Sequence, residues 1–275
     1  MIEPLCITSA ANPRLKEALS LYNRRDRDEK DLFIIEGFRE ISRALQGGVH
    51  FVELFFCEDL FLGTNEQALL SSCQKKDVQL IKLEERLLRK LSYRDRPDGL
   101  IGIAKKMHAT LSDIPKFTAT PPLVVIAEAI EKPGNLGTII RSSDAAGADV
   151  VIVANGCTDI YNPNVVRASV GTLFTLPVVE ATNEEAFAFC TELGITLLAT
   201  IPDGASTYTD ILMTGPLGIV VGTEQLGLSS FWKQVCHHKV KIPMHGIADS
   251  LNVATATTLF LFEAARQRHA SKNPV

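Results

Sequence analysis

One segment near the C-terminus places several chemically useful side chains at the expected start of a helix. Asp249, Ser250 and Asn252 follow the strand-like run 238–242 and precede a long segment with helical periodicity. A helix N-terminus has unpaired N–H groups and partial positive charge, so it can hold a polar or anionic ligand. Serine is also a common N-cap, and this segment alone leaves both capping and catalysis open.

Two further segments also place polar side chains after an apolar, strand-like run. Glu224 lies in a glycine-containing turn directly after the apolar run 217–221, and Asn135 and Arg141 follow the apolar run 123–127. In open α/β sheets, ligand sites lie beyond the carboxyl ends of the strands. Three such strand exits in one half of the chain favour a ligand site over ordinary loop chemistry.

The order, spacing and strand context of these segments resemble the three motifs of the SpoU/TrmH-like RNA ribose methyltransferases, within the knotted SPOUT class. The residues that match the three motifs in turn are Asn135 and Arg141, then Glu224, then Ser250 and Asn252. The segments 161–163 and 166–171 are also similar to the family. The resemblance covers residues 123 to 268.

The resemblance implies methyl transfer from S-adenosylmethionine to a ribose 2′-hydroxyl of RNA, with large-subunit (23S) ribosomal RNA as the expected substrate. The implied catalytic residues are Arg141, Asn135, Glu224, Ser250 and Asn252. The implied cofactor contacts are Thr200, Gly222, Glu224, Ile242, Met244, Leu251 and Asn252. The alternatives are a tRNA substrate and an inactive RNA-binding assembly factor, and the intact motif residues disfavour the second. No Gly-x-Gly-x-x-Gly sequence follows a predicted strand, which argues against a Rossmann dinucleotide site.

The role of Arg141 is open at this point. The family is described with this arginine as the proton acceptor, but a guanidinium keeps its proton at any ordinary pH. A bidentate grip on a neighbouring phosphate, with stabilisation of the emerging alkoxide, is the role that physical chemistry favours. A surface arginine in an ion pair is the third possibility.

Composition limits the class of protein. The hydrophobic fraction of 46% and charged fraction of 22% are typical of a globular protein, and the net charge of −4 argues against nonspecific coating of nucleic acid. No apolar run is long enough to span a bilayer, and the first residues do not resemble a secretory signal, so we expect a cytoplasmic protein. The six cysteines have no closely paired spacing, so no metal site is expected.

The elements that position these residues fall into two α/β domains joined by a linker at 107–122. In the first, 1–106, predicted strands at 33–35, 49–56, 78–81 and 100–104 alternate with predicted helices at 37–45, 65–75 and 84–91. This small α/β sandwich resembles the substrate-binding domain that precedes many SpoU-type enzymes, on the segments 9–13, 24–27 and 33–37. The RNA-binding candidates are Arg24, Arg25, Arg27 and Arg167, and a solvated helix face with salt bridges is the alternative for the first three.

The second domain, 123–275, is predicted to be parallel α/β. Its expected strands are 123–127, 150–153, 195–200, 217–221 and 239–242, and its expected helices are 134–146, 183–193 and 251–268. Chain rules alone favour an unknotted sheet, whereas the resemblance implies a trefoil knot. We also expect a homodimer through this domain, because the apolar run 259–262 exceeds one helical face; burial of all four residues within one chain is the alternative.

Overall fold

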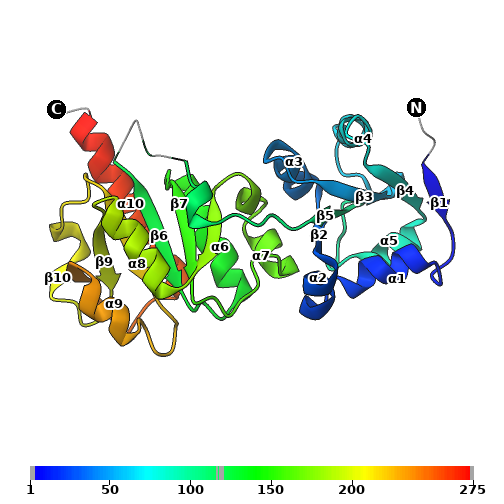
Figure 1. The fold of residues 1–275 in the computed structure, drawn as a ribbon. Coiled ribbons are helices and arrows are strands. Elements are labelled where there is room, and N and C mark those ends of the chain that lie inside the picture. Colours follow the sequence, from blue (N-terminus) through cyan, green and yellow to red (C-terminus); the bar gives the residue numbers. More distant parts are fainter. Residues whose placement is uncertain (1–3, 116, 118–120, 273–275) are drawn as a thin grey trace. The chain divides into compact units, whose positions relative to one another are not determined.

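The computed structural model describes residues 4–115, 117 and 121–272, which form two compact units (Figure 1). The first unit is the chain up to His108 together with Asp159–Thr175, and the second is Ala109–Thr158 together with the chain from Leu176 onward. A single cut at the predicted linker does not describe this division, because Asp159–Thr175 belongs to the N-terminal unit. Residues 116 and 118–120 of that linker lie outside the described residues.

The first unit is built on a five-stranded sheet with the order β1-β4-β3-β5-β2. The strands are β1 (Leu5–Ile7), β2 (Leu32–Glu36), β3 (Phe51–Phe56), β4 (Gln79–Leu83) and β5 (Leu100–Lys105). Strands β1, β4 and β3 are parallel, and β5 runs antiparallel to both β3 and β2. The helices are α1 (Pro13–Ser20), α2 (Arg24–Lys30), α3 (Phe38–Gln46), α4 (Glu66–Gln74), α5 (Glu85–Leu91) and α7 (Pro163–Ala168).

The segment around α7 joins this unit through aromatic packing on β2. The ring of Phe33 lies with its centroid 4.5 Å from that of Tyr161 and 5.7 Å from that of Phe174. Arg43 of α3 also donates a hydrogen bond to the carbonyl of Val170 at 2.7 Å. These contacts explain why a segment from the second half of the sequence completes the first unit.

Helices α1 and α2 were not among the predicted helices, although a solvated helix face was the alternative considered for the arginines of α2. Helix α1 begins at Pro13 and is capped by Asn12, whose side chain accepts a hydrogen bond from the backbone of Arg14 at 2.9 Å. Helix α2 has seven residues, all of them charged, and only Arg27 is buried. A helix without apolar residues shows no hydrophobic periodicity.

The second unit is built on a seven-stranded sheet with the order β10-β12-β9-β11-β6-β7-β8, in which every pairing is parallel. The strands are β6 (Leu123–Glu128), β7 (Val150–Ala154), β8 (Val178–Ala181), β9 (Thr196–Thr200), β10 (Ser206–Thr207), β11 (Leu217–Val221) and β12 (His238–Lys241). Strands β6, β7 and β11 are buried along their whole length. Parallel strands covered on both faces are expected to be continuous apolar runs, as these are.

The helices of the second unit are α6 (Pro133–Ala145), α8 (Asn183–Glu192), α9 (Ser230–Val235) and α10 (Val253–Lys272). Helix α10 packs against α6 and β11, and the hydroxyl groups of Ser142 and Thr258 lie 2.7 Å apart across the two helices. The α/β class is confirmed, and the trefoil knot stays a prediction. Within the described part of the chain, no helix combines the length and apolar character needed to cross a membrane.

Candidate active site and cofactor cavity

The turn that carries Glu224 is shaped by its glycines. After β11 the backbone N–H groups of Thr223 and Gly227 each bond to the other residue's carbonyl at 3.1 Å. A Cβ at Gly222 would lie 2.4 Å from the carbonyl oxygen of Gly227, so only glycine fits there. Gly227 has a φ of 66°, a conformation that glycine adopts without strain. The turn therefore holds Glu224 in a fixed position beyond the carboxyl end of β11.

The carboxylate of Glu224 is the meeting point of all three motifs. Its Oε1 accepts a hydrogen bond from Asn135 Nδ2 at 2.8 Å and another from Asn252 Nδ2 at 2.5 Å. Asn252 Nδ2 also lies 3.2 Å from Asn135 Oδ1, and Lys132 Nζ pairs with Glu224 Oε2. The hydrogen bond from Lys132, followed by that from Asn135, holds the pKa of Glu224 below its usual range. The prediction did not include Lys132, although its place beside Pro133, immediately before α6, was visible in the sequence.

The cap of α10 is Asn252. Its Oδ1 accepts a hydrogen bond from the backbone of Ala254 at 3.0 Å, and its carbonyl accepts one from Ala256 at 2.9 Å. Ser250 is exposed and makes no hydrogen bond with any described residue. Asn252 thus performs the capping considered for Ser250 while its amide also binds Glu224.

Arg141 lies apart from this hydrogen-bonded group, although on the same helix as Asn135. Its side chain is exposed and makes no hydrogen bond or ion pair with the described residues. The surface ion pair considered for Arg141 is therefore not formed within the described part of the chain.

A cavity of about 360 Å³ adjoins Glu224. The predicted cofactor contacts that line it are Thr200, Gly222, Glu224, Ile242, Met244 and Leu251. Ser250 lines it as well, but Asn252 does not. Its wall also contains Asp203, Lys233, Lys241 and Asp249, which the prediction did not assign to the cofactor. Asp203 follows the predicted strand 195–200, Lys241 lies within the predicted strand 239–242, and Asp249 adjoins the third motif. Lys233 lies in α9, a helix that was not predicted.

A network of hydrogen bonds around Glu128 supports the turn that carries Glu224. Glu128, at the end of β6, accepts hydrogen bonds from Ser229 N and from Asn183 Nδ2, both at 2.8 Å. Asn183 Oδ1 accepts from the indole N–H of Trp232 at 3.0 Å. Because Ser229 ends the turn that begins at Gly222, Glu128 fixes the end of the turn opposite β11. In the sequence, the visible sign of this network was one carboxylate, Glu128, directly after the predicted strand 123–127.

The RNA-binding candidates differ in exposure. Arg24 and Arg25 are exposed on α2, and Arg24 Nε lies 3.5 Å from Asp28 Oδ2. The structure corrects the prediction for Arg27. This residue is 1% exposed, and its Nη2 and Nε lie 2.7 and 2.8 Å from Asp159 Oδ2, so RNA cannot reach it. Arg167 is exposed, with its guanidinium carbon 5.6 Å from the centre of the Tyr93 ring.

Residues 122–262 match the SpoU rRNA Methylase family, and residues 12–102 match the MRM3-like substrate binding domain. The chain belongs to the SpoU rRNA methylase family. The resemblance drawn from the three motifs is thereby confirmed.

Among SpoU methylase relatives, the 23S rRNA (uridine(2479)-2′-O)-methyltransferase of Streptomyces viridochromogenes is 32% identical over 94% of this chain and 92% of its own length. The AdoMet-bound rRNA methyltransferase of Sinorhizobium meliloti has a TM-score of 0.85 at 30% identity, covering 95% of this chain and 97% of that one. A crystal structure described as an RNA 2′-O ribose methyltransferase has a TM-score of 0.84 at 40% identity, covering 96% of this chain and 100% of that one.

Proposed function

We propose that this SpoU-family enzyme transfers the methyl group of S-adenosylmethionine to a ribose 2′-hydroxyl of large-subunit ribosomal RNA. The observation that carries the proposal is the convergence of Asn135, Glu224 and Asn252 beside the 360 Å³ cavity. The SpoU relatives named above, which are described as rRNA and RNA 2′-O-methyltransferases, support the same reaction. Because ribosomal RNA is the substrate, we also assign the enzyme to the cytoplasm.

The cavity suits the chemical groups of S-adenosylmethionine. Ile242, Met244 and Leu251 give it apolar walls for a flat base, and the turn at Gly222 brings backbone N–H and C=O groups close to it. Lys233 and Asp249, also in the wall, can pair with the carboxylate and ammonium of an amino acid. The bound cofactor supplies an activated methyl group on a sulfonium, so the protein must chiefly orient the acceptor hydroxyl.

Arg141 is proposed to act on the RNA. Its guanidinium makes no hydrogen bond or ion pair with the described residues, so it is available to an incoming phosphate. From α6 it would grip that phosphate bidentately and stabilise the negative charge that develops on the 2′-oxygen as its proton passes to solvent water. Asn135 and Asn252, held by Glu224, would shape the wall between cofactor and ribose.

A homodimer through α10 is part of the proposal. Phe260 and Leu261 are buried within the chain, whereas Leu259 and Phe262 are exposed large apolar residues of the same helix. Burial within one chain therefore does not account for the whole run 259–262, and a second copy would cover the remainder. Sedimentation at micromolar concentration should show a dimer, and a monomer alone would contradict this part of the proposal.

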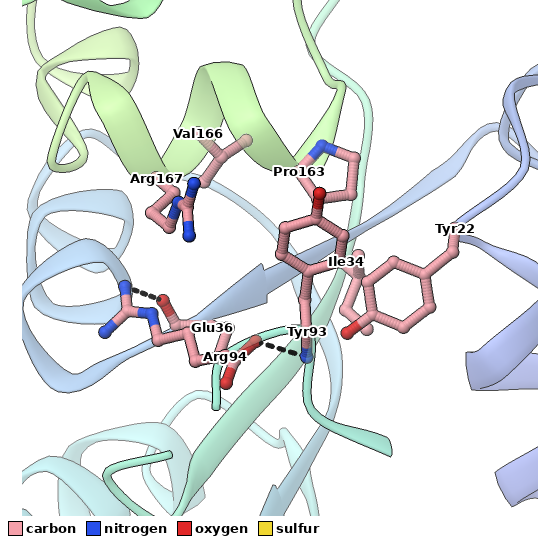
Figure 2. Close-up of a pocket in the computed structure, with 8 residues that line it drawn as sticks. All are labelled: Tyr22, Ile34, Glu36, Tyr93, Arg94, Pro163, Val166 and Arg167. Carbon is pink, nitrogen blue, oxygen red and sulfur yellow. Dashed lines mark hydrogen bonds between the residues drawn. The ribbon is translucent and has the colours of Figure 1, made fainter. Parts of the chain in front are cut away.

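The first unit is proposed to hold the RNA. Arg24 and Arg25 offer exposed positive charge, and Arg167 with Tyr93 offers a guanidinium and an exposed aromatic ring (Figure 2). Unstacked RNA bases stack on aromatic rings and on arginine planes. Tyr93 is held by a hydrogen bond from Asn164 Nδ2 to its hydroxyl at 2.9 Å, and its ring centre lies 5.8 Å from that of Tyr22.

The decisive experiment compares RNA from cells with and without this gene. We expect one 2′-O-methylated nucleotide of 23S rRNA to disappear on deletion, to return with the wild-type gene, and not to return with Arg141→Ala. A lost position in tRNA would establish the tRNA alternative. Unchanged methylation in both RNAs, together with no binding of S-adenosylmethionine in calorimetry, would support an inactive assembly factor.

A further inference from the structure

A second cavity, of about 440 Å³, lies entirely within the first unit beside the start of α3. Three carboxylates line it: Glu40 from α3, Glu66 from the first turn of α4 and Asp98 from the segment before β5. Arg39, Arg94 and the apolar Leu62 also contribute to its wall.

Glu66 and Asp98 each have one oxygen with a hydrogen-bond partner and one oxygen without. Glu66 is 4% exposed; its Oε1 accepts a hydrogen bond from Gly63 N at 2.8 Å, but its Oε2 is buried without any partner among the described residues. Asp98 Oδ2 accepts from Phe38 N at 2.8 Å, and Asp98 Oδ1 is likewise buried and unpartnered. A buried acceptor without a donor is costly, so two in one cavity call for a ligand with N–H groups.

Arg94 does not supply the missing donors. Its Nη2 donates to Glu40 Oε1 at 2.7 Å and to the carbonyl of Glu36 at 2.9 Å, and its Nη1 is 3.9 Å from the already bonded Asp98 Oδ2. Arg94 therefore leaves both oxygens without a donor, and because each is buried, a ligand in the cavity reaches them by displacing the side chains that cover them.

The chemistry of the wall favours a nucleobase over a metal ion. Within the described residues, no group of three or more metal-ligating side chains could hold a metal. Carboxylates accept hydrogen bonds from the exocyclic amino groups of bases, and unpaired RNA bases are read along these edges. Leu62, 81% exposed, offers an apolar surface to a base, and the exposed Arg39 offers charge to its phosphate.

We propose that this cavity binds an unpaired adenine, cytosine or guanine of the RNA substrate, with Glu66 Oε2 and Asp98 Oδ1 accepting hydrogen bonds from the base. Uracil lacks an exocyclic amino group and is disfavoured. This inference rests on the proposed function, because the ligand is taken to be part of the RNA that the enzyme methylates.

The test measures binding of the full-length protein to fluorescent heptamers of rA, rC and rU at one salt concentration. We expect rA and rC to bind about tenfold more tightly than rU, the discrimination typical of one well-placed base contact. In Glu66→Gln the amide oxygen can still accept from Gly63 N, and the amide nitrogen then replaces the unpartnered oxygen. A donor facing a donor should reduce the preference to less than about twofold, and Asp98→Asn should have the same effect.

Two further variants separate charge, space and folding. Gly63→Ala places a Cβ 3.3 and 3.4 Å from the two Glu66 oxygens, so it should narrow the cavity and weaken rA and rC binding without changing any charge. Glu84→Gln removes an exposed carboxylate of the same unit outside this cavity and should keep the tenfold preference. Thermal melting shows which variants are folded, and Asp98→Asn and Gly63→Ala carry the test if Glu66→Gln is not.

Loss of the preference in the cavity variants, with the control unchanged, would support the base-binding site. No preference in the wild type, or a preference that survives in every folded cavity variant, would overturn it. Methyl transfer to ribosomal RNA is measured on the same samples. Active protein without base preference refutes only the cavity assignment, whereas protein that methylates no RNA refutes the proposed function.

Discussion

Arg25→Gln and Arg27→Gln should impair different properties of the protein, although each removes one positive charge from the same short helix. Arg25 is exposed, whereas Arg27 is buried and bonded to Asp159 through Nε and Nη2. Arg27 Nη1 also donates to the carbonyls of Leu21 and Tyr22, at 2.8 and 3.0 Å. We expect Arg27→Gln to lower the free energy of unfolding and Arg25→Gln to weaken RNA binding.

The magnitude follows from what each substitution leaves behind. In Arg27→Gln the carboxylate of Asp159 stays buried, with the backbone N–H of Tyr161 at 2.8 Å as its remaining partner. Removing one member of a buried ion pair costs about 3–5 kcal/mol, against a total stability of about 5–15 kcal/mol. Replacing the exposed Arg25 should change stability by no more than about 0.5 kcal/mol.

Urea unfolding followed by circular dichroism measures the first effect, and RNA affinity over a series of salt concentrations measures the second. A lost phosphate contact should reduce the slope of log K against log salt by about one in Arg25→Gln. The double variant Arg27→Met with Asp159→Leu should recover part of the lost stability, because no unpaired charge then remains buried.

A decrease of less than about 1 kcal/mol in the free energy of unfolding of Arg27→Gln would contradict a buried ion pair between Arg27 and Asp159. The burial of Arg27 would also be contradicted if folded Arg27→Gln weakened RNA binding as much as Arg25→Gln does. Either result would mean that the guanidinium of Arg27 is accessible in solution.

Three other predictions concern the second unit. Arg141→Ala should reduce methyl transfer about a hundred- to a thousand-fold while calorimetry shows cofactor affinity within a few-fold, and near-wild-type turnover by Arg141→Lys would contradict the bidentate clamp. The pKa of Glu224 is lowered, chiefly by Lys132, so its stabilisation of the site is present above the unfolded pKa and is lost as pH falls through the lower folded pKa. Lys132→Met should therefore move the acid-induced loss of cofactor binding to higher pH, and an unchanged pH profile would count against the pairing. Phe262→Glu should shift the sedimenting species toward monomer, and a dimer as tight as that of the wild type would place the interface elsewhere.

The sequence by itself determined the elements whose signals are local. Strands buried on both faces must be apolar throughout, so β6, β7 and β11 were predicted close to their observed bounds. The polar residues that follow β6, β11 and β12 could be related to one another because parallel strands bring their carboxyl ends to one edge of the sheet. Asn135, Glu224 and Asn252 could therefore be expected near one another before any distance was known.

The tertiary structure decided which charged groups are buried and what they bind. Nothing in the charged sequence of α2 distinguishes Arg27 from Arg25, because the burial of Arg27 depends on Asp159, 132 residues away. The membership of Asp159–Thr175 in the first unit and the two unpartnered oxygens of Glu66 and Asp98 are likewise invisible to periodicity. Hydrophobic patterns report which face of an element is apolar, whereas the partner of a buried charge is set by segments that only folding brings together.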